Sequence, residues 1–214
     1  YTAPQVSLNP YYVQLPQCYI SSNPYGGVTG TYGLLNCLAI EDTGTWAVIR
    51  FYYQPGDEGV ILSFQAGQYP NTPYHTLWVY IGTNGYLYFA DWDDTASKAV
   101  YVDFPLTPGW HTLVAGEYFS SGTYYMVAYL DSPSNSQSIS TTDALSLFNG
   151  IGGDNSPYND IGTGYDENNF PSSVNGWFFY NGYIQYIALY PGGSSVGTSL
   201  INSGVFSIAG QQES

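Results

Sequence analysis

The sequence predicts an all-β fold, and three observations support this prediction. Aromatic residues make up 18% of the 214 residues, with 24 Tyr, 10 Phe and 5 Trp, and aromatic side chains favour pleated strands. Alternation of apolar and polar residues recurs along the chain, and short turn signals rich in Gly, Pro, Asn and Asp separate the alternating runs. We therefore expect one antiparallel two-sheet β-sandwich, for which this length is ordinary.

Eight segments have the alternation of a strand. They are Thr45–Tyr53, Val60–Gln65, His75–Ile81, Tyr86–Trp92, Ala99–Phe104, Trp110–Glu117, Tyr124–Leu130 and Trp177–Tyr190. No segment has a competing helical period. The strongest hairpin signal is Thr83-Asn84-Gly85, because Asn-Gly tolerates positive φ at both central positions of a type I′ turn.

Three regions fall outside this pattern. Residues 1–35, rich in Pro, Tyr and Gly, are expected to form an extended N-terminal arm and a loop. Residues 150–175, rich in Gly, Asn and Asp, are expected to be loop, and the Gly/Ser-rich tail 193–214 could add a strand at Val205–Ile208. The sandwich itself would span residues 36–192, with no internal repeat and no second domain.

Charge restricts the classes of partner. Only 8% of residues are charged, with 16 acidic and 2 basic residues and a net charge of −14, so nucleic acid and anionic membranes would be repelled. No run approaches the length of a membrane-spanning segment. In strong acid the net charge would be only about +5, so we expect an acidic extracellular habitat. An ordinary acidic secreted protein is the alternative.

Two cysteines, Cys18 and Cys37, flank a Gly/Ser/Tyr-rich loop without metal-ligand spacing. We expect a disulfide and hence an oxidising compartment, and closing about 20 residues would stabilise the fold by roughly 3 kcal/mol. Two buried free thiols are the alternative. The sequence begins at Tyr1 without an initiator Met, from which we expect a processed, secreted protein.

The order of these segments resembles the concanavalin A-like sandwich of the laminin-G-like type. The matching stretches are TWAVIRFYYQ (Thr45–Gln54), GVILSFQ, LWVYIGTNGYLYFA, PLTPGWHTLVAGEY (Pro105–Tyr118), TYYMVAYLDS, IGGDN and FFYNGYIQYIALYPG (Phe178–Gly192). The Gly-Trp-His step at 109–111 and the strand ending in Asp131 are similar to recurring points of that family. The resemblance covers about two-thirds of the chain and implies a two-sheet antiparallel jelly roll.

The resemblance leaves the function open, since this fold hosts lectins, adhesion domains, proteases and glycosidases. The Glu-x-Asp-x-x-Glu strand of its glycosidases is absent. Glu117 with Gln65 is similar to the Gln/Glu pair of acid peptidases built on a related sandwich, although the surrounding sequence does not match. His75 and His111 have no partner histidine at metal spacing, so we expect packing roles. We expect no enzyme, with an acid hydrolase as the least favoured alternative.

Two clusters could bind ligands. Asp91, Trp92 and Asp93 end a strand and could present an aromatic platform with flanking acceptors to a sugar; the alternative is a solvated hairpin tip anchored by the Trp. A second cluster carries oxygen ligands of the type that Ca²⁺ accepts, and the alternative there is a turn region with Asx hydrogen bonds. Its residues are Asp154, Asn155, Asp160 and Asp166. No other cofactor is expected.

Arg50 lies in the middle of a predicted strand, and we expect it to stack on tyrosines and pair with a carboxylate in a structural role.

The arm suggests self-assembly. Its alternating runs around Val6–Leu8 and Tyr11–Leu15 are separated by Asn9-Pro10, so the arm can extend but cannot form a hairpin with itself. The apolar positions are Val6, Leu8, Tyr11, Val13 and Leu15. We expect the arm to add a strand to a neighbouring copy and build an extracellular filament. The alternatives are an arm packed on its own domain and a carbohydrate-binding adhesion domain with surface glycans as partners.

Overall fold

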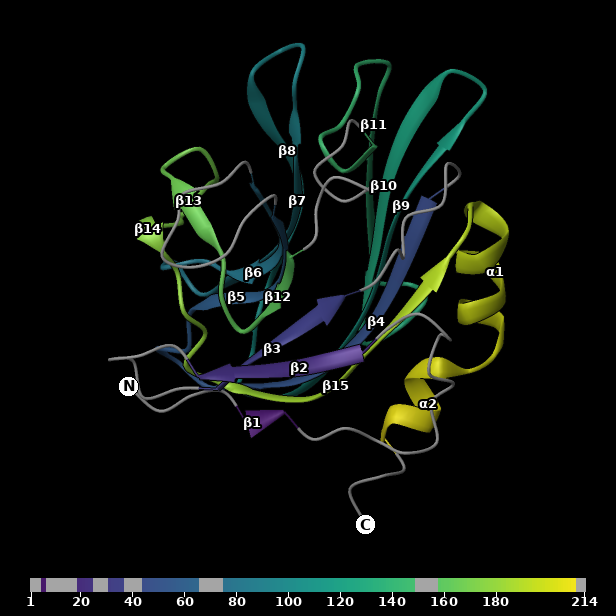
Figure 1. Ribbon diagram of the computed structural model, residues 1–214. Helices are drawn as coiled ribbons and strands as arrows, with labels where there is room; N and C mark the ends of the chain where they lie inside the picture. Colours follow the sequence, from purple (N-terminus) through teal and green to yellow (C-terminus); the bar gives the residue numbers. More distant parts are fainter. Residues whose placement is uncertain are drawn as a thin grey trace.

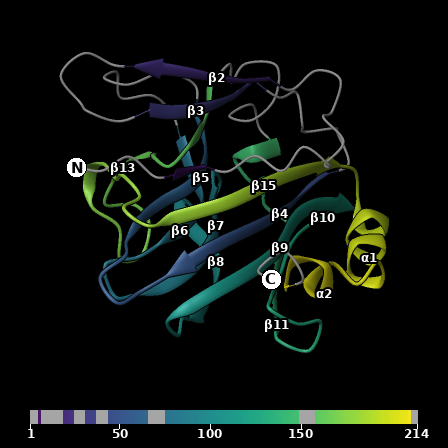
Figure 2. The same cartoon turned by 90° about the horizontal axis from the view of Figure 1, so that it is seen from below.

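The computed structural model describes residues 5–6, 19–24, 31–36, 44–65, 75–148 and 158–210. In this part of the chain two β-sheets form a sandwich, and two helices flank one of them (Figures 1 and 2). Sheet A contains, in spatial order, β1 (Gln5–Val6), β15 (Tyr183–Pro191), β4 (Gly44–Tyr53), β9 (Gly109–Ser120), β10 (Thr123–Leu130) and β11 (Ser136–Thr141).

Sheet B contains seven strands. In spatial order they are β2 (Tyr19–Pro24), β3 (Thr31–Asn36), β12 (Tyr158–Ile161), β5 (Gly59–Gln65), β6 (His75–Ile81), β7 (Tyr86–Asp93) and β8 (Lys98–Pro105). A small pair, β13 (Tyr165–Glu167) and β14 (Asn175–Trp177), and the helices α1 (Ser194–Asn202) and α2 (Val205–Gly210) complete the fold. Neighbouring described strands are antiparallel except β1 and β15, which are parallel.

Alternate residues of the strands fill the space between the sheets, as the period of two requires. Ile49 and Phe51 of β4 face this core, as do Leu113 and Ala115 of β9. Trp78 lies at its centre and meets the rings of Phe64 and Phe89 edge-on at 5.0 and 4.9 Å. The core thus combines aliphatic side chains with large aromatic rings.

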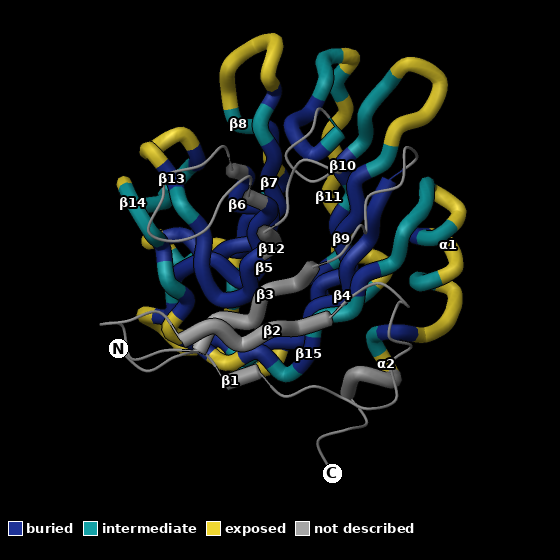
Figure 3. The backbone as a smooth tube through the Cα atoms, viewed as in Figure 1, coloured by how far each residue is buried: buried dark blue, intermediate teal, exposed yellow. Residues whose placement is uncertain are grey.

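The outer faces of both sheets are covered as well. On sheet B, Phe170 and Phe178 from the β13–β14 segment pack on Tyr80 and Tyr88. On sheet A, the helices place Val196, Leu200, Ile201, Val205 and Phe206 against a second apolar cluster. This double cover explains why β4 is buried along nearly its whole length, and Figure 3 shows exposed residues mainly at hairpin tips and on the helices.

The strands predicted between residues 45 and 130 all form, with ends shifted by three residues at most. The predicted hairpin after Ile81 also forms, and Gly82 N donates to Tyr86 O at 2.9 Å. Its turn type was wrong: only Gly85 has positive φ (77°), while the Asn84 side chain accepts a hydrogen bond from Tyr86 N at 3.1 Å. The Asn is therefore used for its side chain and not for a left-handed backbone.

Two expectations about the C-terminal third were wrong. The segment Trp177–Tyr190 is not one strand, because residues 178–182 separate β14 from β15. Within this connection Tyr180 donates its hydroxyl to Tyr52 O at 3.2 Å. The tail forms α1 and α2 instead of an added strand. Val196, Leu200 and Ile201 recur at a helical spacing, and sheet A supplies the apolar surface that makes this short helix stable.

Part of the N-terminal arm lies on the domain itself. Gln5 and Val6 pair with Tyr183 and Ile184 of the same chain. The side chains of Val6, Leu8, Tyr11, Val13 and Leu15 lie outside the described part, so the assembly prediction is untested there. β2 and β3 form a hairpin on sheet B.

The predicted disulfide also stays a prediction. Cys18 and Cys37 lie outside the described residues, and they are the next residues in the sequence beyond the paired Tyr19 and Asn36. Within the described ranges, no helix is long and apolar enough to cross a membrane.

Candidate functional site

A pair of carboxyl groups lies in the interior of the sandwich. Asp91 follows the core residues Leu87 and Phe89 on β7, and Glu117 follows Leu113 and Ala115 on β9, so the alternation of each strand turns its acid inward. Both side chains are 0% exposed. The two sheets thus each contribute one carboxyl group to the same buried place.

The hydrogen bonds distinguish the two acids. Asp91 Oδ1 accepts from Trp92 N at 2.7 Å, and its Oδ2 accepts from Leu147 N at 2.9 Å. Glu117 Oε2 accepts from Trp78 Nε1 at 3.1 Å, while its Oε1 has no donor among the described groups. Because two N–H groups stabilise the Asp91 anion and only one stabilises that of Glu117, Glu117 is the acid that keeps its proton to the higher pH.

Both pKa values are raised. Burial raises the pKa of Asp91 to about 6, although hydrogen bonds from Leu147 and Glu117 oppose the shift. Burial and the neighbouring Asp91 charge raise the pKa of Glu117 well above its usual value. The pair therefore holds at least one proton in mild acid. Both carboxyl groups are buried, so the pair lies between the two sheets in the interior of the sandwich. Gln65 was suggested as the partner of Glu117 in an acid hydrolase, and the Gln65 side chain lies outside the described part.

A second polar cluster, formed by His111, Asp131 and Thr107, lies at the end of β10. His111 is 6% exposed, and its Nδ1 lies 2.7 Å from Asp131 Oδ2 while its Nε2 lies 2.7 Å from Thr107 O. Burial lowers the pKa of His111, but the hydrogen bonds to Asp131 and Thr107 outweigh it and raise the pKa. The ring also packs on Phe51 at 5.6 Å. These contacts confirm the packing role expected for His111.

Arg50 is buried beside this cluster. Its Nη1 donates to Thr112 Oγ1 at 2.9 Å and its Nε donates to Gln185 Oε1 at 3.1 Å. The guanidinium lies 5.3 Å from the centre of the Trp110 ring. Trp110 is therefore a stacking partner of Arg50, and these contacts join β15, β4 and β9.

The predicted sugar platform has a different geometry. Asp91 and Asp93 are buried, and Asp93 Oδ1 accepts from Thr95 N and Ala96 N at 3.0 and 2.7 Å. Trp92 is half-buried, with its ring 6.1 Å from that of Phe170. The expectation of an exposed aromatic flanked by free acceptors is thus wrong, because the strand turns both acids inward.

Of the four predicted calcium ligands, Asp160 and Asp166 lie in the described part of the chain. Asp154 and Asn155 lie outside the described residues, and burial raises the pKa of Asp160 to about 7, so that its carboxyl is a poor cation ligand in acid. Asp166 is fully buried and accepts from the backbone N–H groups of Glu167, Asn169 and Phe170 and from the Ser173 hydroxyl. Among the described residues no three acidic, His or Cys side chains form a metal-binding group. Asp166 instead organises a turn, as the alternative proposed.

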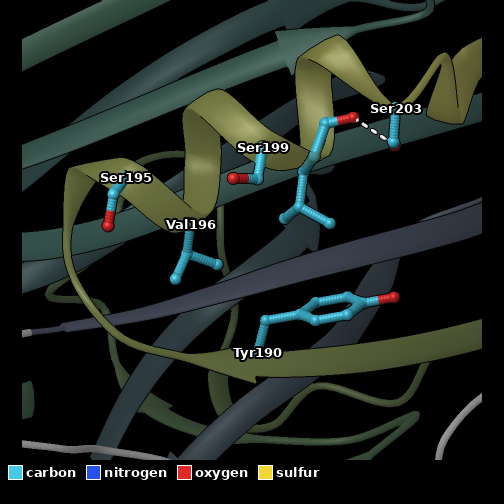
Figure 4. Close-up of a pocket in the computed structure, with 6 residues that line it drawn as sticks. Tyr190, Ser195, Val196, Ser199 and Ser203 are labelled. Carbon is cyan, nitrogen blue, oxygen red and sulfur yellow. Dashed lines mark hydrogen bonds between the residues drawn. The ribbon is translucent and has the colours of Figure 1, made fainter.

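An open groove of about 480 Å³ lies between β15 and α1 (Figure 4). It is lined by Tyr190, Ser195, Val196, Ser199, Leu200 and Ser203. Ser195 and Ser199 lie four residues apart on α1, and Ser203 follows the end of the helix, where its hydroxyl donates to Leu200 O at 2.6 Å. Sequence reasoning missed this groove because the tail was expected to be a strand, and the serine spacing was the signal that could have found it.

Comparison with known proteins does not assign this chain to a family. No protein-family profile matches the sequence, and no curated protein is significantly similar. A solved structure described as NanB plus Optactamide is 16% identical, with a TM-score of 0.48, over 74% of this chain and 24% of that chain. A tailspike protein 2 from Escherichia coli O157:H7 bacteriophage CAB120 is 13% identical, with a TM-score of 0.48, over 80% and 23%. The chain thus spans about a quarter of these proteins. Likeness of this extent says nothing about activity or partners.

Proposed function

We propose that this protein is a secreted structural subunit with a laminin-G-like jelly-roll sandwich, and that copies assemble outside the cell by strand exchange. In this proposal the N-terminal arm leaves its own domain and adds a strand to the next copy. The contact residues on the arm are Val6, Leu8, Tyr11, Val13 and Leu15. The contact is head-to-tail, so its repetition produces a filament or an extended surface layer.

The observation that carries the proposal is the pairing of β1 with β15. It shows that residues of the arm take up strand conformation and pair with a sheet edge. Among the described residues the pairing joins Gln5 to Tyr183 and Val6 to Ile184 and is parallel, and parallel pairing is slightly weaker per residue than antiparallel pairing. In this proposal the arm exchanges the parallel pairing on its own domain for a longer pairing on a neighbour.

The distribution of charge and cover also supports association through edges. Residues 1–15 contain no Asp, Glu, Lys or Arg, in a chain with a net charge of −14. Two such copies repel each other at neutral pH, so a contact between them is expected where charge is absent. The helices and the β13–β14 segment already cover the outer sheet faces, which leaves sheet edges for strand addition.

Deletion of the arm tests the proposal. The variant lacking residues 1–16 should remain monomeric by light scattering and electron microscopy, under acidic conditions where the full chain forms polymers. A variant lacking only residues 1–4 keeps both alternating runs and is the matched control, which should polymerise normally. Polymers formed without residues 1–16, or a full chain that is monomeric under every condition, would contradict strand exchange.

Carbohydrate binding is the second candidate, and the groove between β15 and α1 favours it over the Asp91–Asp93 segment. Tyr190 offers a ring on which a sugar can stack, and the serine hydroxyls of α1 offer hydrogen bonds. If the full chain proves monomeric, a glycan array with native protein and with Tyr190→Ala decides whether this groove binds sugar.

A further inference from the structure

The outer edge of β11 ends sheet A without a covering strand. β11 pairs with β10 on one side, from Thr141↔Tyr124 to Ser136↔Tyr129, and no described strand lies on its other side. Five of its six residues are exposed. An edge of this length presents a row of unpaired N–H and C=O groups to solvent.

The phase of the β10–β11 ladder shows which backbone groups point outward. Leu130 N donates to Asn135 O at 3.0 Å, directly next to the last register pair, Tyr129 and Ser136. Hydrogen-bonded and non-hydrogen-bonded pairs alternate in an antiparallel ladder. The N–H groups of Gln137 and Ile139 therefore point to β10, while those of Ser136, Ser138 and Ser140 point away from the sheet.

The two faces of β11 differ in polarity. Ile139 is opposite Met126 and Gln137 is opposite Ala128, and Met126 and Ala128 both belong to the core between the sheets. Residues opposite each other share a face, so Gln137 and Ile139 face sheet B. Gln137 Nε2 donates to Asp103 O of β8 at 2.5 Å, whereas Ile139 remains 39% exposed. The serines occupy the other face.

This edge lacks the features with which proteins usually prevent edge pairing. The sequence Ser-Gln-Ser-Ile-Ser-Thr contains no charge and no proline, and its ladder has no register shift. The neighbouring edge strand β8 is protected, because it begins with Lys98, carries Asp103 and ends at Pro105. Charged residues and prolines are the usual means of blocking edges, so of these two adjacent edges only β11 is open to a further strand.

We propose that β11 is the acceptor edge on which the N-terminal arm of a second copy adds as the next strand of sheet A. This inference rests on the strand-exchange function proposed above and names its acceptor. The run Tyr11–Leu15 is one residue shorter than β11 and alternates in the same way: Tyr11, Val13 and Leu15 extend the face of Ile139, and Tyr12 and Gln14 lie on the serine face. Neither segment carries a charge, so the pairing escapes the repulsion between two acidic copies.

The variant Ser138→Pro tests the acceptor edge. Proline removes one outward N–H without removing a hydrogen bond to β10. We expect polymerisation to fall at least tenfold, while Ser138→Ala, which keeps the backbone N–H, should polymerise normally. Near-UV circular dichroism checks that both variants are folded. Should Ser138→Pro fail to fold, a photo-crosslinking residue placed at Ser138 of the full chain replaces it, and the expected cross-link joins residues 1–16 of another copy.

A mixing experiment separates this inference from the strand-exchange proposal. The chain lacking residues 1–16 can only accept a strand, and Ser138→Pro can only donate one. Each should be monomeric alone, and a mixture should form one-to-one dimers that do not grow further. Polymers of Ser138→Pro, or cross-links from position 138 that avoid the arm, would overturn β11 as acceptor even if arm deletion abolishes assembly. Polymers of the arm-deleted chain would instead overturn strand exchange itself.

Discussion

Asp91 and Glu117 are carboxylic acids that folding removes from water. In the unfolded chain such groups titrate near pH 4, whereas burial raises the pKa of Asp91 to about 6 and that of Glu117 well above its usual value. Burial likewise raises the pKa of Asp160 to about 7. The folded protein therefore holds protons that the unfolded chain has already released.

The sign of the resulting pH dependence is opposite to ordinary acid denaturation. A raised pKa in the folded state contributes stability that is fully present below about pH 4 and is lost as pH rises through the folded pKa. We expect the free energy of unfolding to fall between about pH 4 and pH 7. For Asp91 alone the loss is on the order of 3 kcal/mol.

The variant Glu117→Gln should reduce this loss. The amide can still accept the hydrogen bond from Trp78, and its N–H group can donate to Asp91. Asp91 then ionises without a second carboxylate beside it. We expect higher stability than the native chain at pH 7 and similar stability at pH 3, measured by chemical denaturation. Glu167→Gln, at an exposed position, is the control and should leave the pH curve unchanged. Equal pH curves for native protein and Glu117→Gln would show that the pair does not control stability.

Trp46 forms a close contact between helix α1 and sheet A. Trp46 Nε1 donates to Gly193 O at 3.0 Å, just before the helix. A Cβ at Gly197 would lie 2.2 Å from the Trp46 ring, and a Cβ at Gly116 would lie 2.0 Å from it. The ring thus fills the space that two glycines leave, which permits the close approach of helix and sheet.

Substitution of Gly197 by Ala tests this contact. Helix propensity alone would make Gly197→Ala stabilising by about 1 kcal/mol, but the methyl group must displace a buried ring. We expect net destabilisation of about 1–3 kcal/mol, with altered tryptophan fluorescence. Ser195→Ala, at an exposed position of the same helix, is the control and should be neutral or slightly stabilising. A Gly197→Ala protein as stable as this control would refute the close packing.

At the scale of the whole molecule, the dominant property is the net charge of −14. Protonation of the exposed carboxylates lowers the repulsion between copies, and protonation of the buried carboxyl pair removes charge from the interior of each copy. Repulsion between exposed carboxylates extends roughly 10 Å at moderate salt and less at high salt. The arm and the β11 edge avoid this charge locally, but the rest of each surface does not.

Assembly should accordingly depend on pH and salt. We expect stronger polymerisation at pH 3 than at pH 7 in low salt, and partial recovery at pH 7 when salt is added. Sedimentation of the full chain across a pH and salt series measures this, with the arm-deleted chain as the reference for unspecific aggregation. Assembly that is strongest at pH 7 in low salt would indicate a contact governed by something other than charge repulsion.

The sequence by itself determined the strands from residue 45 to residue 130 and the net charge of the chain. Each of these strands carries its own signal, because the alternation of apolar and polar residues is set by the geometry of a single strand. The net charge is a sum over the charged residues, so it can also be obtained from the sequence alone. β11 was missed because Ser136–Thr141 has almost no apolar residues. The helices were missed because the tail was expected to add a strand, although Val196, Leu200 and Ile201 recur at a helical spacing.

Only the tertiary structure decided which acids meet. In the sequence Glu117 was associated with Gln65, and Asp91 was grouped with Trp92 as a sugar platform. The packing of β7 against β9 across the core instead joins Asp91 to Glu117. Spacing along a chain says which face of a strand a residue occupies, but not which strand of the opposite sheet that face will meet. Which strands face each other across the core depends on how the two sheets pack, and this packing is set only when the whole domain folds.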